Sequence, residues 1–560
     1  MPIIPASLEF AADGTPCSSV FGDIYHSSDG ALGQARHVFL AGNDLPRRWQ
    51  GRERFVIVET GFGLGLNLLA TWAAWRADPR RAARLHFVSC ELHPFRRQDL
   101  CTVHTALAAQ APEIAPLAAA LQARWPALTP GLHHIHLDGE RVTLSLFLGD
   151  AADGLANMRL SADAFFLDGF SPAKNPQLWS ARIFHLLARL AAAEATLATW
   201  SVAGMVREGL RRAGFDCDKA PGFGGKRQML RGRYRGPGRH VTASGHRHAL
   251  VLGAGVAGSS VAERLAARGW RVDVIDAANQ PGAGASGNHA GVLRPLPSLD
   301  DNRLSRLTRA GTLYALQHLA HLEELGQRVR FDPCGVLHIA RDALQEDKQR
   351  AVVERHRPPA EHLRYVDREQ ASRIAGWPLA NGGWWFPSSG WVQPPSLCRA
   401  NLGTVNLDLG HPRVDARLVL LHQCAIDVSF RLLTLQLGLV HLDLGKLAFD
   451  DCAVVVRVGL VGSQQCPVLL DGGIVNLNCV VGVLLGGVER ELFQLPRVVD
   501  ELAFHLHARS DCVFQVRLFQ LGLLDRHVAA QLGQLVVVVL LRLAQLRRDD
   551  PGRQREPKRL

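Results

Sequence analysis

The sequence predicts an α/β protein with two domains, each built around an open parallel sheet with helices packed on it. Two observations carry this prediction. Twice along the 560-residue chain, a run of apolar and β-branched residues ends in a glycine-rich turn and continues with the pattern of a helix. In both places a second apolar run follows and ends in an acidic residue, which is the arrangement of a βαβ unit.

Length and composition limit the classes of protein to consider. A chain of 560 residues exceeds one hydrophobic core, at ~100–200 residues per domain. Hydrophobic residues make up 47% and charged residues 21%, as in ordinary globular proteins, and the net charge of +11 favours a polyanionic partner. The 11 cysteines include no C-x-x-C pair, so neither a metal site nor a disulfide framework is predicted.

The sequence gives no sign of export or of a membrane span. Its N-terminus lacks a basic region followed by an apolar core, and no uninterrupted apolar run reaches the ~20 residues of a spanning helix. We therefore expect a cytoplasmic protein that makes no membrane contact. The oligomeric state is not indicated.

The first glycine turn predicts a binding site for S-adenosylmethionine. Residues 1–50 contain no motif that demands a chemistry, but residues 55–58 read as a buried strand and residues 66–75 as a helix. Between them the E-x-G-x-G-x-G spacing suits a charged amino acid and a ribose rather than two phosphates. The predicted contacts are Glu59, Gly61, Gly63 and Gly65.

Three further strands are expected to end in acidic residues. Glu91 is placed to bind ribose hydroxyls, Asp150 to meet an adenine amino group, and Asp168 follows the last of these strands. Ligands of open parallel sheets bind at the carboxyl ends of the strands, so these acids predict one Rossmann-like site. The alternative is four unrelated strand caps.

Asp168 is the candidate catalytic residue. It precedes Gly-Phe-Ser-Pro at the predicted edge, where its carboxylate can hold an attacking amine or accept its proton beside the sulfonium methyl. The alternative is an Asx-type turn cap, the commoner role of an isolated aspartate.

The composition becomes basic between residues 201 and 240, with 10 Lys or Arg against 3 acids. A flexible basic segment with interleaved Phe and Gly can follow a nucleic-acid backbone. The alternative is a solvated helix face with a linker over residues 232–245. The candidate RNA contacts are Lys174, Arg207, Lys226 and Arg227.

The second glycine turn predicts a dinucleotide site. Gly253, Gly255 and Gly258 follow strand 249–252 in G-x-G-x-x-G spacing and lead into a helix expected over 259–268. The next strand ends at Asp276, 18 residues after Gly258, where a carboxylate can bind ribose hydroxyls. An ordinary βαβ turn is the alternative. A second loop of small residues, expected against the cofactor, contains Ser286, Gly287 and Asn288.

Together these motifs resemble the family of bifunctional tRNA 5-methylaminomethyl-2-thiouridine biosynthesis proteins. The matching segments are residues 59–67, 163–176, 222–227, 286–288 and 390–395, and the resemblance covers about residues 5–400. It implies a SAM-dependent tRNA methyltransferase domain over 1–235, a linker over 236–246 and the first part of an FAD-dependent oxidoreductase domain over 247–400. It assigns FAD to the second glycine turn and tRNA as the partner.

The resemblance also implies a reaction sequence. The flavin domain removes the carboxymethyl group from 5-carboxymethylaminomethyl-2-thiouridine by oxidation beside nitrogen and hydrolysis, and the other domain methylates the freed amine. The alternatives are a small-molecule amine methyltransferase fused to an amino-acid-oxidase-like flavoprotein, a methyltransferase with a crippled oxidase, and a non-catalytic RNA-binding protein.

Residues 401–560 do not share the resemblance. All 11 tryptophans, 4 tyrosines and 4 methionines precede residue 392, and the lysines after residue 400 are Lys446 and Lys558. We expect this segment to be atypical, either translated in a shifted reading frame or disordered, and the oxidase to be impaired if the segment is genuine.

Overall fold

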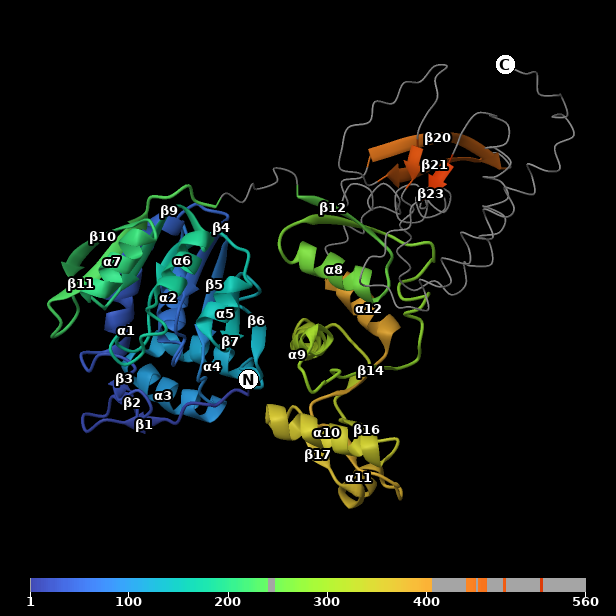
Figure 1. The fold of residues 1–560 in the computed structure, drawn as a ribbon, viewed down its shortest axis with the longest axis horizontal. Coiled ribbons are helices and arrows are strands. Elements are labelled where there is room, and N and C mark those ends of the chain that lie inside the picture. The colour runs from blue at the N-terminus through green and yellow to red at the C-terminus, as the bar shows by residue number, and fades with distance from the viewer. Residues whose placement is uncertain are drawn as a thin grey trace, which may run out of the picture. The chain divides into compact units, whose positions relative to one another are not determined.

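The computed structural model describes residues 2–239 and 247–404, together with four strands farther along the chain (Figure 1). The chain divides into two compact units, Met1–Pro412 and Arg413–Leu560. Both predicted glycine turns lie in the first unit. The α/β fold class predicted from the sequence is confirmed.

An eight-stranded sheet organises the residues before the first gap. Its order is β10-β11-β9-β8-β4-β5-β7-β6. The strands are β4 (Arg54–Glu59), β5 (Arg84–Glu91), β6 (Gly131–Leu137), β7 (Val142–Leu148), β8 (Ala162–Phe166), β9 (Ala191–Thr199), β10 (Phe215–Pro221) and β11 (Gln228–Tyr234). The five strands from β9 to β7 in this order run parallel, while β6, β10 and β11 are antiparallel to their neighbours. The carboxyl ends of the parallel strands therefore share one edge.

Helices cover both faces of this sheet (Figure 1). They are α2 (Leu66–Ala77), α3 (Arg97–Gln110), α4 (Ala115–Ala123), α5 (Ala151–Ala156), α6 (Ala181–Leu190) and α7 (Gly204–Arg212), with the 3-10 helix η4 (Pro112–Ile114). Phe55 and Ile57 of β4 are buried in the core formed with α2 and α4, whereas Val56 and Val58 are buried in the core formed with α6. Successive side chains of a strand point to opposite faces, so one short strand supplies both cores.

Residues 201–239, the described part of the basic stretch, are not a flexible segment, and that expectation is wrong. They form α7 and the hairpin β10–β11, and β11 pairs with β9 at the edge of the main sheet. The expected linker over 232–245 likewise begins inside β11. Backbone pairing with β9 holds this stretch in the sheet despite its charge.

The segment before the main sheet forms small elements. These are β1 (Glu9–Phe10), β2 (Pro16–Ser18), β3 (Asp23–Ile24), α1 (Ala31–Gln34), the π-helix η1 (Ala35–Leu40) and the 3-10 helices η2 (Ala41–Asn43) and η3 (Arg47–Trp49). Phe39 and Trp49 are fully buried in the core shared with α2. This packing fixes the segment against the sheet.

The second glycine turn lies in a βαβ unit made of β12 (His248–Leu252), α8 (Val256–Ala266) and β13 (Arg271–Ile275), whose strands are parallel. The helix begins three residues earlier than expected because Gly255 is its N-cap. The remaining strands are β14 (Gly291–Leu293), β15 (Phe331–Asp332), β16 (Val336–Ile339), β17 (Arg364–Val366), β18 (Gly383–Phe386) and β19 (Gly390–Val392). The helices are α9 (Arg303–Glu324), α10 (Ala343–His356), α11 (Arg368–Ala375) and α12 (Pro394–Thr404).

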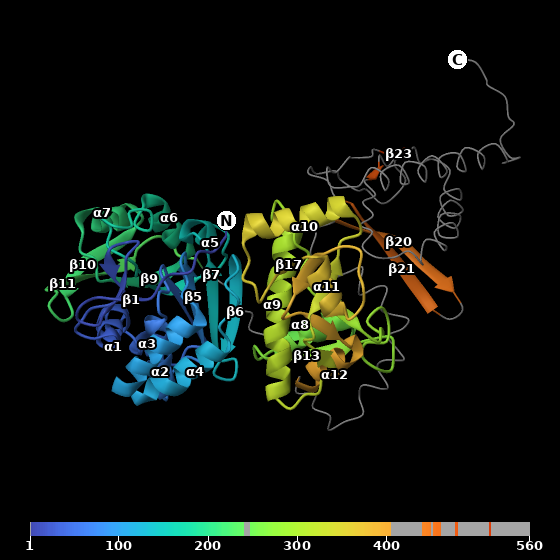
Figure 2. The same ribbon diagram turned by 90° about the horizontal axis from the view of Figure 1, so that it is seen from below.

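Two packing contacts organise this part of the chain. Helix α12 packs against α8, while α10 and α11 pack against the strands β16, β17 and β18 (Figure 2). Trp384 and Phe386 of β18 are buried in the small hydrophobic core formed there, so these two aromatic side chains serve packing.

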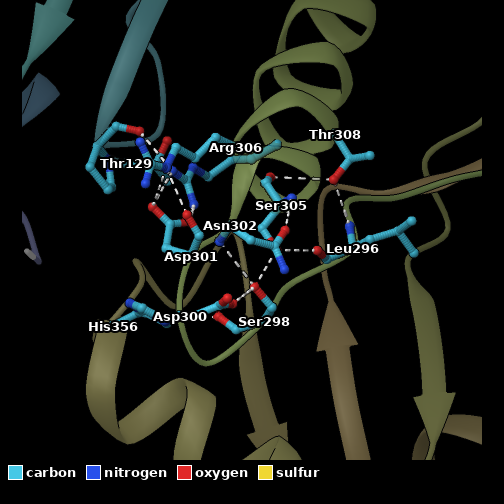
Figure 3. A network of polar contacts seen from close by, with 12 residues as sticks. Thr129, Leu296, Ser298, Asp300, Asp301, Asn302, Ser305, Arg306, Thr308 and His356 are labelled. Atoms are coloured by element: carbon cyan, nitrogen blue, oxygen red, sulfur yellow. Dashed lines mark hydrogen bonds and ion pairs between the residues drawn. The ribbon is translucent and has the colours of Figure 1, made fainter. Parts of the chain in front are cut away.

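A polar network holds the loop before α9 (Figure 3). Asn302 caps the helix by accepting a hydrogen bond from the Ser305 amide at 3.1 Å. The Ser305 hydroxyl donates to the Leu296 carbonyl oxygen at 2.7 Å, and Arg306 donates through Nε to the Asp301 carbonyl oxygen at 2.7 Å. The Asn302 bond satisfies an N–H group that the helix N-terminus leaves free, and the other two bonds satisfy carbonyl groups of the preceding loop.

Beyond α12 the described elements are β20 (Val440–Phe449) and β21 (Cys452–Leu460), an antiparallel pair, and β22 (Leu477–Cys479) and β23 (Phe514–Val516), a parallel pair. The prediction for residues 401–560 otherwise falls outside the described residues. None of the helices in the described ranges combines the length and apolar character needed to cross a bilayer. Among the same residues, no cluster of three His, Cys, Asp or Glu is arranged to hold a metal ion.

Candidate active site

The carboxyl edge of the main sheet opens onto a pocket of about 340 Å³. Its wall includes the turn residues Gly61 and Gly63 together with Glu91, Asp150 and Asp168. The sequence prediction placed four acids at this edge, and three of them line the pocket. The fourth, Glu59, is fully buried beneath it.

The first glycine turn favours glycine at three positions, at two through the backbone angle and at one through a close backbone contact. Gly63 and Gly65 have φ angles of +52° and +73°, in the left-handed region that side chains disfavour. A Cβ on Gly61 would lie 3.1 Å from the backbone oxygen of Asp168. Gly65 is the N-cap of α2, so it starts the helix while the other two glycines line the pocket.

Glu91 and Asp150 are held by backbone amides at the pocket wall. The two carboxylate oxygens of Glu91 accept hydrogen bonds from Gly63 N at 2.7 Å and His93 N at 2.8 Å. Asp150 caps α5 through Oδ1, which accepts from Ala152 N at 2.8 Å. Because each carboxylate oxygen can accept more than one hydrogen bond, both residues keep acceptor capacity for a ligand.

Asp168 is the most strongly perturbed acid of the pocket wall. Its Oδ1 accepts from Gly169 N at 2.8 Å and its Oδ2 accepts from Asn67 Nδ2 at 2.7 Å. Burial raises the pKa of Asp168 to about 6, while hydrogen bonds from Gly169, Asn67 and Trp200 act in the opposite direction. The carboxyl therefore titrates close to neutral pH, as a group that exchanges a proton with a substrate should.

The sequence prediction missed the N-terminal contribution to the pocket. Phe21 and Tyr25 line it beside Phe170, and the Phe21 and Phe170 rings stack with centroids 4.6 Å apart. Tyr25 meets Phe170 edge-on at 5.0 Å. These aromatic side chains give the mouth of the pocket flat apolar surfaces on which a base can stack.

The four predicted RNA contacts separate in the structure. Within residues 2–239, Lys226 is the one of the four that lines the pocket, and its Nζ lies 3.6 Å from the centre of the Trp200 ring. Lys174 pairs with Asp23 at 3.5 Å. Arg207 lies on α7 and Arg227 lies in the turn between β10 and β11. Their role in RNA binding stays a prediction.

The second glycine turn has the tight geometry of a nucleotide loop. Gly253 has a φ of +93°, and a Cβ on Gly258 would lie 1.8 Å from the Gly253 carbonyl oxygen, so helix and strand approach too closely for any side chain. Asp276 accepts from Ala254 N at 2.5 Å and from Ala278 N at 2.8 Å. The predicted acid therefore lies directly beside the turn.

The loop of Ser286, Gly287 and Asn288 lies at the N-terminus of α8. Ser286 Oγ accepts from Val256 N at 3.1 Å, and a Cβ on Gly255 would lie 2.9 Å from the same oxygen. Asn288 donates to the Ala285 carbonyl oxygen at 3.2 Å. The structure thus brings the predicted loop and the predicted glycine turn together around one helix N-terminus, where phosphates bind favourably.

Comparison with known proteins agrees with the two predicted cofactors, S-adenosylmethionine and FAD. Residues 112–235 match a family described as S-adenosyl-L-methionine-dependent methyltransferase, and residues 248–409 match the FAD-dependent oxidoreductase family. The tRNA 5-methylaminomethyl-2-thiouridine biosynthesis bifunctional protein MnmC of an Azoarcus species is 71% identical over 403 residues, and that of Aromatoleum aromaticum is 66% identical over 406 residues.

These alignments cover 72% of this chain and 63% of each relative, so the chain spans less than two thirds of the length of the relatives it matches. The same protein of Ralstonia nicotianae is 50% identical, over 71% of this chain and 61% of its own. Over about 400 residues the chain is therefore similar to bifunctional tRNA 5-methylaminomethyl-2-thiouridine biosynthesis proteins, with one segment that matches a methyltransferase family and a following segment that matches an FAD-dependent oxidoreductase family.

Proposed function

We propose that this protein acts on the wobble uridine of tRNA in two steps. The second domain removes the carboxymethyl group of 5-carboxymethylaminomethyl-2-thiouridine, and the first domain methylates the freed amine to give 5-methylaminomethyl-2-thiouridine. The observation that carries the methyltransferase assignment is the placement of Asp168 and the glycine turn in the wall of one pocket.

The residues of the first pocket fit S-adenosylmethionine. Gly61 and Gly63 leave room for the amino-acid part, while Glu91 and Asp150 keep acceptor capacity for a ribose and an adenine amino group. S-adenosylmethionine, when bound, supplies an electrophilic methyl group. Its predicted contacts in this chain are Glu59, Gly61, Gly63, Gly65, Glu91 and Asp150, with Glu59 acting from beneath the pocket.

Asp168 accepts the proton in the methyl-transfer step. The amine nitrogen bonds to the methyl carbon as the carbon–sulfur bond breaks, and the proton lost by nitrogen passes to a carboxylate oxygen of Asp168. Because the pKa of Asp168 is raised to about 6, this carboxyl is ionised at neutral pH yet binds a proton more readily than an exposed aspartate. Alignment in the pocket supplies the rest of the acceleration.

The residues of the second site fit the dinucleotide part of FAD. Glycines at 253, 255 and 258 leave backbone space at the α8 N-terminus, and Asp276 lies beside them. FAD held by these residues would supply the hydride acceptor for oxidation of the carbon–nitrogen bond. Hydrolysis of the oxidised substrate would then free the amine and release the carboxymethyl carbons as glyoxylate.

The tRNA contacts, the domain limits and the location are part of the same proposal. Lys226 at the pocket and Lys174, Arg207 and Arg227 outside it contact the RNA. The methyltransferase domain spans residues 1–235, the linker 236–246 and the oxidoreductase part 247–400. A tRNA substrate implies a cytoplasmic location.

The methyl-transfer step is tested on tRNA that carries 5-aminomethyl-2-thiouridine. The full chain, S-adenosylmethionine and this tRNA are incubated, and the digested nucleosides are analysed by mass spectrometry. A gain of one methyl group on the modified uridine, lost with Asp168→Asn, supports the proposal. Methylation of small amines but not of the tRNA would favour a small-molecule methyltransferase instead.

The oxidative step is tested first by the visible absorption spectrum of the purified chain. An oxidised-flavin spectrum at about one flavin per chain supports an FAD-binding second domain, and the carboxymethylated tRNA is then assayed. A colourless protein that does not take up added FAD contradicts the oxidative half and leaves a methyltransferase whose substrate arrives with its amine free.

A further inference from the structure

Asn67, in the first turn of α2, lies between two carboxyl groups. Its Nδ2 lies 2.9 Å from Glu59 Oε1 and 2.7 Å from Asp168 Oδ2. A side-chain amide has two N–H groups, so a single Asn67 nitrogen can donate one hydrogen bond to each carboxyl. Asn67 is 7% exposed, so water competes little for either bond.

The Glu59 side of this bridge is closed. Glu59 is fully buried, and its second oxygen accepts from Ser89 Oγ at 2.6 Å. Burial raises the pKa of Glu59 well above its ordinary value, which favours the neutral form. Glu59 therefore anchors Asn67 from behind without a strong competing charge.

The Asp168 side of the bridge faces the pocket. Gly169 N holds Oδ1 at 2.8 Å, Asn67 holds Oδ2, and Thr60 Oγ1 donates to the backbone oxygen of Asp168 at 2.7 Å. Three donors thus fix both the carboxyl group and the strand end that carries it. Hydrogen bonds from neutral donors to a carboxylate favour its ionised form.

We propose that Asn67 is a positioning residue for methyl transfer: anchored on Glu59, it orients the Asp168 carboxylate toward the pocket and favours its ionised form. The inference rests on the proposed function, in which Asp168 accepts the proton of the amine. Asn67 itself transfers no proton, and it acts through Asp168.

The test is Asn67→Leu in the full chain, which removes both donated hydrogen bonds at nearly constant shape. Loss of one hydrogen bond to an ionised group moves a pKa by roughly one to two units. We expect the acidic break in the pH profile of tRNA methylation to move up by about that amount. Activity at pH 7 then falls about fourfold for a shift of 1.5 units and recovers toward pH 9.

Two readouts separate positioning from a merely structural role. The affinity for S-adenosylmethionine, measured by calorimetry, is expected to change less than about threefold. In the parent, the melting temperature of the unliganded chain falls as the pH rises through the pKa of Asp168. In Asn67→Leu this fall is expected to continue to a higher pH, by the same shift as the break in the pH profile of methylation. Asn157→Leu, at an exposed amide that donates to the Asp153 carbonyl oxygen, is the matched control and leaves both breaks in place.

An unchanged break in Asn67→Leu overturns the inference. If that variant does not fold, Asn67→Asp provides the same test, because a third carboxyl in the cluster of Glu59, residue 67 and Asp168 should move the break upward still further. Asp168→Asn separates the proton-accepting role of Asp168 from the positioning role of Asn67. If Asp168→Asn keeps full activity and an unchanged pH profile, the role of Asp168 itself is refuted. If Asp168→Asn is inactive but the break in the pH profile of Asn67→Leu does not move, only the positioning role is refuted.

Discussion

Asp168→Asn is expected to stabilise the protein at alkaline pH while it removes methyl transfer. Burial raises the pKa of this carboxyl from 3.8 to about 6, so the folded chain binds its proton more tightly than the unfolded chain does. Between about pH 4 and pH 6 the unfolded chain binds fewer protons at this position, and the free energy of unfolding falls as the pH rises. Above pH 6 the full loss of stability caused by ionising the buried carboxyl is present, and asparagine avoids this loss because it does not ionise.

The size of this stability loss follows from the change in the pKa of Asp168 on folding. A change of about two pKa units corresponds to about 3 kcal/mol in the free energy of unfolding. At pH 4 the protonated acid and the amide resemble each other, since each offers one good acceptor to the donors Gly169 N and Asn67 Nδ2. The stability difference between variant and parent is therefore expected to grow by about 3 kcal/mol between pH 4 and pH 8. The pH dependence of all distant groups cancels in this difference.

The assay is differential scanning calorimetry of both full-length proteins from pH 4 to pH 8. At about 2–4 °C per kcal/mol for a domain of this size, the melting temperature of the variant should gain about 6–12 °C on the parent across the range. Methyl transfer by the variant should fall by about 10²–10⁴-fold, the usual loss when a proton acceptor is removed. Parallel melting curves at every pH would refute the assignment of a raised pKa to Asp168.

Three further predictions concern the two glycine turns and Lys226 in the pocket wall. Gly63→Ala forces a side chain into a φ of +52°, at about 1–2 kcal/mol, and should weaken binding of S-adenosylmethionine in calorimetry. Gly258→Ala places a methyl group against the Gly253 carbonyl oxygen and should abolish flavin uptake, as read from visible absorption. Lys226→Gln removes the cation over Trp200, so tRNA affinity should fall and its logarithmic salt slope should decrease by about one.

Each of these predictions has a matched control. Gly204→Ala and Gly284→Ala add the same methyl group where a Cβ meets no described heavy atom within 4 Å, and neither glycine has a positive φ in the disfavoured range. Lys219→Gln removes the same charge from β10, away from the residues that line the pocket. Equal effects in a variant and its control would contradict the corresponding argument.

Local sequence patterns predicted the elements that carry the site. The alternation and glycine spacing around Glu59 and Gly253 reflect backbone requirements of a βαβ turn, and such requirements are visible in consecutive residues. The acids Glu91, Asp150 and Asp168 were predictable because the ends of parallel strands meet at one edge. The strands predicted before Glu59, Glu91, Asp150 and Asp168 correspond to β4, β5, β7 and β8 of the structure, whereas their order in the sheet was not predicted.

The parts that the sequence did not predict depend on contacts between distant segments. Phe21 and Tyr25 meet Phe170 across almost 150 residues, and no periodicity in the first 50 residues indicates that pairing. Asn67 had one local signal, as the polar residue in the apolar start of α2, but its two partners come from the end of β4 and from the loop after β8. Long-range pairing of this kind is set by the packed sheet, and local propensity carries no information about it.

The buried cluster of Glu59, Asn67 and Asp168 is itself an argument for chemistry at this edge. Two carboxyls with raised pKa values make the folded state less stable at neutral pH than two amides of the same shape would. A cluster that served only packing could use amides without that cost. In this cluster an amide anchored on a buried acid holds a titrating carboxyl in the pocket wall. Such a carboxyl is useful where a proton must be accepted during a reaction. The Asp168 variant tests the proton acceptor itself, and the Asn67 variant tests the residue that holds it.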